Sequence, residues 1–269
     1  MREVYLKKRD VEIRKRPKES HKGQHGRCLV IGGCERYAGA PGLAGMAALR
    51  AGCDIVEIAA PENVAWTINA YSPDLITLKI PGRNLSTTHM KKLKGYIKDA
   101  DAVLLGNGLG KRDQFVRACI EEIQRQGKHL VLDGDAIGAV ALQRLRHCIM
   151  TPHAGEAERL AEVSGIRNDV KELQSVLQGD SVILLKGAID TIISEGRVFL
   201  NRTGNAAMAK AGTGDVLAGM CAGFLAQGHS MVQSCINASY LMGHFGDMVF
   251  RDKGYALTAT DIIERMKIP

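Results

Sequence analysis

Aromatic residues are scarce in this sequence. They make up 4% of its 269 residues, and there is a single tryptophan. Proteins that hold single-stranded nucleic acid stack the bases on aromatic side chains, so the composition disfavours that class. Hydrophobic residues at 45% and charged residues at 24% are typical of globular proteins, and the 30 glycines suggest a fold that depends on backbone turns.

Paired cysteine motifs are also missing. The seven cysteines are odd in number and widely spaced, and they form no C-x-x-C pair. This pattern argues against a disulfide framework and against a zinc knuckle. No apolar segment follows the charged N-terminus, as it would in a secretory signal. We therefore expect reduced thiols in the core of a cytoplasmic protein.

Long hydrophobic runs are absent too. No Asp, Glu, Lys or Arg occurs from Val216 to Gly246, but the apolar run within that stretch, Val216–Ala226, has only 11 residues. A membrane-spanning helix needs about 20. Two buried helices explain the stretch better, and we expect no membrane partner.

Net charge is nearly absent from most of the chain. The sequence carries +7 in total, and its first 27 residues hold ten basic and four acidic residues, a net +6. Such a leader is typical of a solvated extension or a subunit-packing arm more than of a nucleic-acid tail. We therefore expect a basic extension at residues 1–26, one domain at residues 27–269, a homo-oligomer and no nucleic-acid partner.

Short apolar runs alternate with amphipathic stretches after this leader. Such runs are typical of parallel strands covered on both faces, with helices as the crossovers. The expected strands are Arg27–Gly32, Ile55–Ala60, Ala102–Gly106, His129–Asp133, Cys148–Thr151 and Val182–Lys186, with an antiparallel edge hairpin at Thr191–Ser194 and Arg197–Leu200. The expected helices are Gly42–Ala51, His89–Lys98, Gln114–Gln126, Gly155–Ser164, Asp169–Leu177, Asp215–Gln227 and Met231–Phe250. The pattern predicts a three-layer α/β/α sandwich with a mostly parallel central sheet.

Small and ionisable residues follow these strands. Ligands of open parallel sheets bind beyond the carboxyl ends of the strands, so these residues should meet at one edge. They are Gly32–Pro41, Asn107–Gly110, Asp133–Asp135, Thr151–Glu156, Lys186–Gly187 and Asn201–Asp215.

The strongest local signal is a glycine-rich loop that leads into an apolar helix. It reads from Thr203 through Gly212-Thr213-Gly214 to Asp215. Free N–H groups and the positive end of the helix dipole form an anion site there, and glycine lets a phosphate approach the backbone. Asp215 can be a helix cap, but a carboxylate beside an anion site also suits a base that takes a proton from a hydroxyl attacking phosphorus. We favour the base.

The two common nucleotide signatures do not occur. There is no G-x-x-x-x-G-K-[ST], and the spacing of Gly106, Gly108 and Gly110 is not G-x-G-x-x-G. The sequence therefore disfavours both a P-loop nucleotide site and a Rossmann dinucleotide site.

Taken together, the motifs resemble those of the ADP- or ATP-dependent NAD(P)H-hydrate dehydratases of the ribokinase-like superfamily. The resemblance runs from about His21 to Pro269. The residues that carry it are His21–Gly23, Gly39-Ala40-Pro41, Gly106–Gly110, Thr151-Pro152-His153 with Gly155-Glu156, Leu185-Lys186-Gly187, Thr203-Gly204-Asn205 and Gly212–Asp215.

This resemblance implies a ribokinase-like fold and a repair reaction on damaged NADH or NADPH. Such enzymes phosphorylate the ring hydroxyl of the hydrated nicotinamide, in its S-epimer, from ADP or ATP with Mg²⁺, and loss of phosphate restores the reduced ring. The implied base is Asp215, with backbone donors from Gly212, Thr213 and Gly214. The implied contacts to the hydrated dinucleotide, besides Asp215, are Ala40, Gly108 and His153, and those to the AMP part of the donor are Lys186, Gly187, Ala188, Ile189, Asp190 and Gly214.

Several of these positions also have simpler explanations. Lys186 can be a lysine that reaches solvent, His153 a packed loop residue, and Glu156 an ordinary acid at a helix start or an indirect magnesium ligand. Asp133 and Asp135 can be turn formers or ligand contacts. No metal site made of protein ligands alone is expected.

Two residues depart from the family pattern. Asn107 stands where proline is usual and Gly134 where alanine is usual, and we expect both changes to loosen the local backbone. Many relatives carry an N-terminal epimerase, which the segment before the first expected strand is too short to hold, so we expect the dehydratase alone. The alternative is a ribokinase-like kinase of a small vitamin-precursor alcohol.

Overall fold

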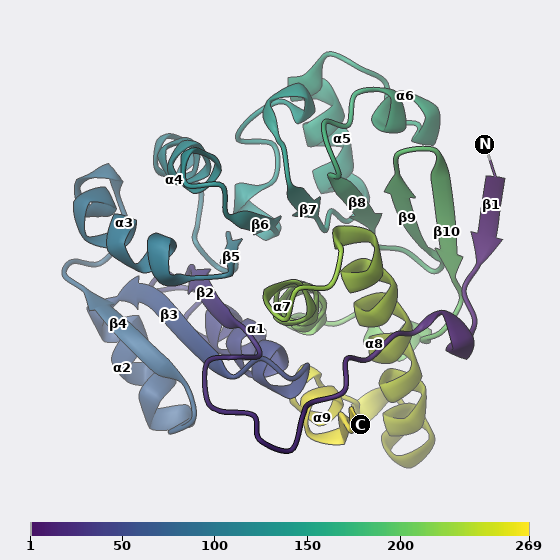
Figure 1. Ribbon diagram of the computed structural model, residues 1–269, viewed down its shortest axis with the longest axis horizontal. Coiled ribbons are helices and arrows are strands. Elements are labelled where there is room, and N and C mark those ends of the chain that lie inside the picture. Colours follow the sequence, from purple (N-terminus) through teal and green to yellow (C-terminus); the bar gives the residue numbers. More distant parts are fainter. Residues whose placement is uncertain (1, 269) are drawn as a thin grey trace.

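The computed structural model describes residues 2–268 and shows a central sheet between two layers of helices (Figure 1). The sheet has ten strands in the order β1-β10-β9-β8-β7-β6-β5-β2-β3-β4. Strand β9 is antiparallel to both of its neighbours, and the other pairs are parallel. The three-layer, mostly parallel sandwich that the sequence predicts is therefore confirmed, together with the antiparallel hairpin of β9 and β10.

The bounds of the elements follow the chain. The strands are β1 (Arg2–Tyr5), β2 (Arg27–Ile31), β3 (Ile55–Pro61), β4 (Ile76–Ile80), β5 (Ala102–Leu105), β6 (His129–Leu132), β7 (Cys148–Met150), β8 (Val182–Leu185), β9 (Asp190–Ser194) and β10 (Arg197–Asn201). The α-helices are α1 (Gly39–Arg50), α2 (Glu62–Tyr71), α3 (Met90–Asp99), α4 (Asp113–Arg125), α5 (Ala154–Ser164), α6 (Val170–Ser175), α7 (Thr213–Ala226), α8 (Met231–Lys253) and α9 (Ala259–Arg265). Short 3-10 helices are η1 (Lys8–Asp10), η2 (Thr87–His89), η3 (Gly134–Ala136), η4 (Leu142–Arg144), η5 (Ala206–Met208) and η6 (Gly254–Ala256).

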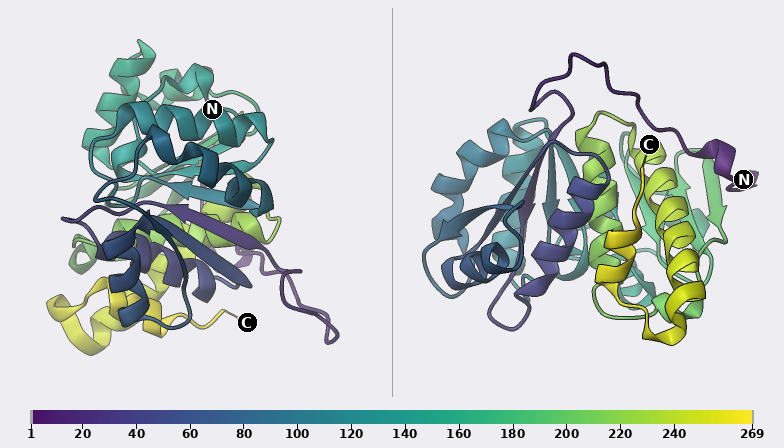
Figure 2. Two further views of the ribbon diagram at one scale, coloured as in Figure 1. Left: turned by 90° about the vertical axis from the view of Figure 1, so that its left-hand side faces the viewer. Right: turned by 90° about the horizontal axis from the view of Figure 1, so that it is seen from below.

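Two hydrophobic cores lie on opposite faces of the sheet. Along β2, Cys28 and Val30 point into one core while Leu29 and Ile31 point into the other, because successive side chains of a strand alternate. Helices α1, α2, α7, α8 and α9 cover the first core, and α3, α4, α5 and α6 cover the second (Figure 2). Burial on both faces explains why these strands read as continuous apolar runs.

Several elements escaped the sequence analysis. Helix α2, strand β4 and helix α9 were not expected, and β1 joins the edge of the sheet from within the segment taken as an extension. Edge strand β4 alternates polar and apolar residues and lacks the apolar run used as the strand signal. Helix α1 begins at Gly39, earlier than expected, so Ala40 and Pro41 lie in its first turn.

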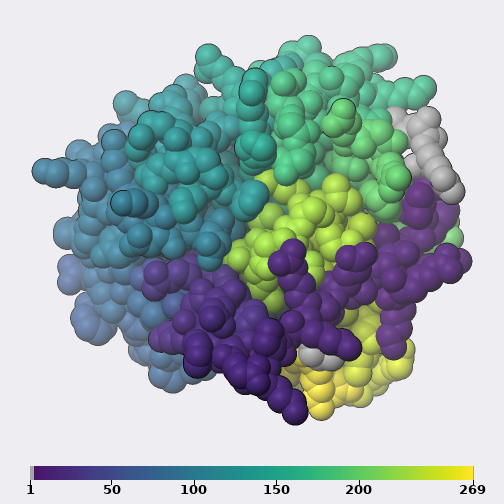
Figure 3. Space-filling view, viewed as in Figure 1, coloured from purple at the N-terminus to yellow at the C-terminus, as the bar shows by residue number. Residues whose placement is uncertain are grey.

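The N-terminal segment after β1 crosses the outer face of α8 (Figure 3). The side-chain amide of Asn237 on α8 donates to the carbonyl of Glu12 at 2.7 Å and accepts from the N–H of Glu12 at 3.0 Å. The uncharged first part of α8 is mostly buried within the chain, as the sequence predicts for this stretch. All seven cysteines are free and buried, and no helix within residues 2–268 is long and apolar enough to cross a membrane.

The direction of chain progression reverses between β5 and β2. From β2 the chain steps to β3 and β4 on one side, and later to β5, β6, β7 and β8 on the other. The loops that follow β2 and β5 therefore lead to helices on opposite faces of the sheet, α1 and α4. In doubly wound sheets, ligands bind between two such loops. Helix α7 begins near the same edge and packs closely on α1.

The contact between α1 and α7 depends on glycine. A Cβ at Gly219 would lie 2.1 Å from the carbonyl oxygen of Ala44, and one at Gly223 would lie 2.7 Å from that of Ala48. Both obstacles are backbone atoms, so no side-chain rotation can relieve the overlap. The register of α7, and with it the position of its first turn, follows from this close approach.

We expect Gly219→Ala to lower the free energy of unfolding by about 2 kcal/mol, because the added methyl group pushes α7 away from α1. The matched control is Gly95→Ala in α3, where a Cβ meets nothing within 4 Å. That change should raise stability by roughly 0.5–1 kcal/mol through helix propensity alone. Urea denaturation measures both. Equal stability of the two variants would contradict the close-contact argument.

Candidate active site

The start of α7 is an open anion site. Gly212 precedes the helix with φ +93°, a left-handed conformation in which a Cβ would also lie 2.8 Å from a methyl group of Leu43. Within residues 2–268 the N–H groups of Gly212, Gly214 and Asp215 have no hydrogen-bond acceptor. These free donors and the helix dipole favour a negative group.

The backbone N–H of Thr213, which the sequence analysis expected to face the phosphoryl group, already has an acceptor in this structure. Its N–H donates to the carbonyl of Lys210 at 3.3 Å, which closes the turn before the helix. Its hydroxyl oxygen lies 2.8 Å from the carbonyl oxygens of Met208 and of Lys210. Thr213 therefore shapes the loop, while the amide of Asp215 adds a donor that the sequence analysis did not name.

Asp215 meets three other functional groups that come from three different strand ends. Asn107 follows β5, Asp133 follows β6, and Lys186 follows β8. The side-chain nitrogen of Asn107 donates to Asp215 Oδ1 at 2.7 Å and to Asp133 Oδ2 at 2.9 Å. Lys186 Nζ donates to Asp133 Oδ1 at 2.9 Å and lies 3.3 Å from the position of a Cβ on Gly214. A carboxylate, an ammonium and free amides thus surround one small volume.

Burial raises the pKa of Asp215 to about 7. The hydrogen bond from Asn107 lowers the pKa, the charge of Asp133 raises it, and the charge of Lys186 lowers it again. A carboxylate with a pKa near neutrality is well matched to general-base catalysis at physiological pH.

Asp133 and Lys186 form a partly buried ion pair beside this volume. The side chain of Asp133 also accepts from the hydroxyl of Thr151 at 2.7 Å, so both of its oxygens are engaged. Burial alone lowers the pKa of Lys186, but the charges of Asp133 and Glu156 outweigh it and hold the pKa above its ordinary value. The ammonium therefore stays charged beside the amides of α7.

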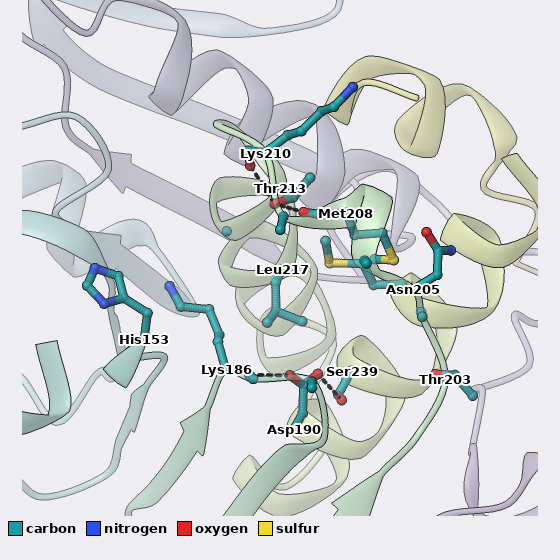
Figure 4. A pocket seen from close by; sticks show the side chains of 18 residues that line it. His153, Lys186, Asp190, Thr203, Asn205, Met208, Lys210, Thr213, Leu217 and Ser239 are labelled. Carbon is teal, nitrogen blue, oxygen red and sulfur yellow. Dashed lines mark hydrogen bonds between the residues drawn. The ribbon is translucent and has the colours of Figure 1, made fainter. Parts of the chain in front are cut away.

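A cavity of about 740 Å³ opens beside the start of α7 (Figure 4). In Figure 4 the side chains of His153 and Lys186 lie on one side of it, and those of Met208 and Asn205 on the other. The lining residues are His153, Lys186, Gly187, Ala188, Asp190, Thr203, Gly204, Asn205, Ala206, Met208, Ala209, Lys210, Thr213, Gly214, Leu217, Ser239, Met242 and Gly243. Most residues that the sequence assigned to the nucleotide therefore share one cavity.

Ile189 is the exception among those residues. It is 42% exposed and lines a separate, smaller hollow near α6. Its neighbour Asp190 turns inward, where it accepts from the N–H of Gly187 at 3.1 Å and from the hydroxyl of Ser239 at 2.8 Å. Burial raises the pKa of Asp190, whose carboxyl fixes the loop against α8.

His153 has a structural role in addition to its place at the cavity. Its Nδ1 accepts from the N–H of Gly155 at 3.1 Å and caps α5, while Glu156 accepts from the N–H of His153 at 2.9 Å. Nδ1 as an acceptor leaves the proton of the neutral ring on Nε2. Nε2 lies 3.5 Å from Glu156 Oε1, so Glu156 faces both ends of the His153 cap.

The residues predicted for the dinucleotide lie partly outside this cavity. Ala40 and Gly108 are neighbours, because a Cβ on Gly108 would lie 2.9 Å from the Cβ of Ala40. Ala40 lies in the first turn of α1 and Gly108 in the loop after β5. The N–H of Gly33, in the loop after β2, donates to the carbonyl of Asn107 at 2.9 Å and joins the two loops. His153 lies across the edge of the sheet, on the loop after β7.

Sequence reasoning missed the parts played by Asn107 and Ser239. Asn107 was expected only to loosen its loop, but its side chain is 1% exposed and holds two carboxylates. The signal was its place just beyond a buried strand, beside β6, whose end carries Asp133. Ser239 had no signal, because it lies in the middle of a helix.

We expect Asp215→Asn to stabilise the protein at neutral and alkaline pH. The raised pKa means that the folded state holds a proton that the unfolded state releases between about pH 4 and pH 7, so stability falls as the pH rises through this interval. Asn cannot ionise, so the variant does not lose stability in this way. Its free energy of unfolding should exceed that of the wild type by about 2 kcal/mol at pH 8 and by little at pH 4. Thermal and urea unfolding at both pH values measure the difference. An equal effect at both would contradict the raised pKa.

The sequence profile of the NAD(P)H-hydrate dehydratase family matches residues 28–267. A bifunctional NAD(P)H-hydrate repair enzyme of Archaeoglobus fulgidus is 38% identical over 250 residues, which are 93% of this chain and 52% of that relative. The chain spans about half the length of the bifunctional relatives that it matches. An ADP-dependent (S)-NAD(P)H-hydrate dehydratase of Cenarchaeum symbiosum is 34% identical, with 93% of this chain and 90% of the relative aligned.

Solved structures agree with this relationship. A ribokinase-like superfamily protein of Enterococcus faecalis has a TM-score of 0.85 at 29% identity, with 98% of this chain and 94% of that chain covered. The Bacillus subtilis ADP/ATP-dependent NAD(P)H-hydrate dehydratase, co-crystallised with ATP and Mg²⁺, has a TM-score of 0.75 at 28% identity and covers 94% of this chain and 92% of its own. The family profile, the similar sequences and the shared fold agree: this chain belongs to the NAD(P)H-hydrate dehydratase family.

Proposed function

We propose that the protein uses ADP or ATP to dehydrate the S-epimer of hydrated NADH or NADPH and so restores the reduced dinucleotide. The observation that carries the proposal is the group at the start of α7. There, free amides lie next to a carboxylate whose pKa burial raises to about 7 and next to a charged lysine, at the mouth of a large cavity. The named activities of the Cenarchaeum symbiosum and Bacillus subtilis relatives support the choice of substrate.

In the first step, Asp215 takes the proton of the ring hydroxyl. The hydroxyl oxygen attacks the terminal phosphorus of the nucleotide, and the bond from that phosphorus to its bridging oxygen breaks. The amides of Gly212, Gly214 and Asp215 donate to the transferring phosphoryl group, whose charge Lys186 also offsets. The shortened nucleotide then leaves.

In the second step, the new phosphate ester leaves the ring. The bond between the ring carbon and oxygen breaks, inorganic phosphate departs and a proton is lost from the neighbouring carbon, which restores the double bond. The net result is removal of water from the ring and cleavage of one phosphoanhydride bond. Ala40, Gly108 and His153 are our candidates for holding the dinucleotide, since they lie in the first turn of α1 and on the loops after β5 and β7, at the edge of the sheet where α7 begins.

Magnesium fits this site as a companion of the nucleotide. Among residues 2–268 no three His, Cys, Asp or Glu side chains cluster in a way that could hold a metal ion, and both oxygens of Asp133 are engaged. Mg²⁺ is commonly bound through substrate phosphates, several waters and few protein ligands. Glu156 would hold it indirectly, and the ion would neutralise phosphate charge.

The nucleotide would occupy the cavity beside the loop of residues 186–190. That loop is fixed by Asp190, and the opposite wall is fixed by Asp247, which accepts from the N–H of Gly204 at 3.1 Å and from the side chain of Asn205 at 2.9 Å. Two rigid walls favour binding because little order is lost when the ligand enters. A cytoplasmic location and a homo-oligomer stay predictions from the sequence.

The decisive experiment mixes the protein with hydrated NADH, ADP or ATP, and Mg²⁺. We expect the absorbance of reduced nicotinamide to recover, with one inorganic phosphate released per ring. Accumulation of a stable phosphorylated alcohol, without recovery, would instead place the protein among the kinases of small alcohols.

Asp215→Asn should lower the turnover of this reaction by roughly 10² to 10⁴, because the hydroxyl loses its proton acceptor. Nucleotide binding, measured by calorimetry, should survive. The control is Asp180→Asn, which removes an exposed carboxylate near the opposite end of β8 that pairs with His147. If the turnover of Asp215→Asn is close to that of the control, Asp215 is not the base.

A further inference from the structure

The buried side chain of Asn107 contacts two carboxylates at the edge of the sheet. Asn107 lies just beyond the end of β5, it is 1% exposed, and its side-chain nitrogen lies between two carboxylates from different parts of the chain. That nitrogen donates one hydrogen to Asp215 at 2.7 Å and the other to Asp133 at 2.9 Å. Its carbonyl oxygen is buried and has no partner among residues 2–268.

The chemistry of the amide explains this orientation. Rotation by 180° would place the carbonyl oxygen against two carboxylates, which both accept hydrogen bonds when ionised. A buried oxygen without a partner is costly, so the two bonds on the other side must outweigh that cost. A hydroxyl has one hydrogen and a carboxylate has none. Asparagine is thus a short side chain that can serve both carboxylates from one atom.

We infer that Asn107 is a positioning residue for the reaction, which holds Asp215 by one oxygen and leaves the other oxygen to receive the proton of the substrate. The catalytic part of this inference rests on the proposed function, and the positional part stands on the contacts alone. By binding Asp133 at the same time, Asn107 ties the base to the pair of Asp133 and Lys186, so that the base keeps a fixed distance from the ammonium. Asp215 is therefore held from β5 as well as from its own helix.

Charges from other elements act on Asp215, directly or through Lys186. Asp133 follows β6 and Asp135 lies in η3, and both oppose ionisation of Asp215. Lys186, at the end of β8, favours it, and Glu156 on α5 lies 3.7 Å from the same ammonium. Asn107 adds the strongest influence that favours the ionised form. Without its hydrogen bond the carboxylate should take up a proton at higher pH.

The first test is the pH dependence of dehydration by Asn107→Ala. We expect kcat near neutral pH to fall roughly 10- to 100-fold, the scale for a hydrogen bond to a charged group, with the KM for nucleotide changed less than about threefold. The acid limb of the kcat profile should move to higher pH, so that the loss shrinks in alkaline buffer. A loss of the same size at every pH, a change in KM alone, or wild-type turnover would each overturn the inference.

The matched control is Asn237→Ala. Asn237 is also buried and its side-chain amide is also hydrogen-bonded, but it joins α8 to the N-terminal segment. The Asn237→Ala change should lower the melting temperature without moving the acid limb of the kcat profile. Asn107→Ser is the second variant, because its single hydroxyl hydrogen can serve only one carboxylate, and it should fall between wild type and Asn107→Ala. If Asn107→Ala does not fold, the same comparison is made with Asn107→Ser. A pH profile of Asn107→Ser equal to that of the wild type would then overturn the inference.

A second measurement does not depend on the reaction. The carboxyl carbon of Asp215 is followed by NMR in protein labelled at aspartate, with the signal identified by its absence from Asp215→Asn. We expect the apparent pKa of Asp215 to be higher in Asn107→Ala than in the wild type and unchanged in Asn237→Ala. An unchanged value in Asn107→Ala overturns the inference. A shifted value in a protein that does not act on hydrated NADH upholds the position of Asn107 and rejects the proposed function instead.

Discussion

The structure depends on one electrostatic arrangement, a carboxylate kept near the start of a helix where anions are to be bound. Asp215 stands beside free amides that attract phosphate, yet its own charge opposes a phosphate there. Burial resolves the conflict by raising the pKa of Asp215 to about 7, so that a small change in its surroundings decides whether it is charged. Asn107 and Lys186 favour the ionised form, and Asp133 and Asp135 oppose it.

Packing far from the cavity positions these groups. Helix α7 approaches α1 so closely that Gly219 and Gly223 have no room for a Cβ, which fixes where the first turn of α7 lies against the loop after β2. The ends of β5, β6 and β8 bring Asn107, Asp133 and Lys186 to the same edge of the sheet. The stability lost to a buried, ionised Asp215 is offset by two continuous cores on either side of the sheet.

Local patterns were enough to predict the strands of the parallel sheet, the loop before α7 and most residues around the cavity. They failed for β1 and β4, which are edge strands and lack the apolar runs that buried strands show, and for the helices α2 and α9. They also misjudged Asn107. Its effect depends on Asp133 and Asp215, which lie 26 and 108 residues away in the sequence. No local signal carries such a contact.

The sequence by itself determined the fold class and the family, and it predicted an anion site at Gly212 to Asp215, because each rests on periodicity or on consecutive residues whose backbone chemistry is local. Tertiary structure alone decided which side chains share that site. It left the amide of Asp215 free and bonded that of Thr213 to Lys210, turned Ile189 outward, and set Asn107 between two carboxylates. The physical reason is that charge, burial and hydrogen bonding act through space, and the order of strands in a sheet sets those distances.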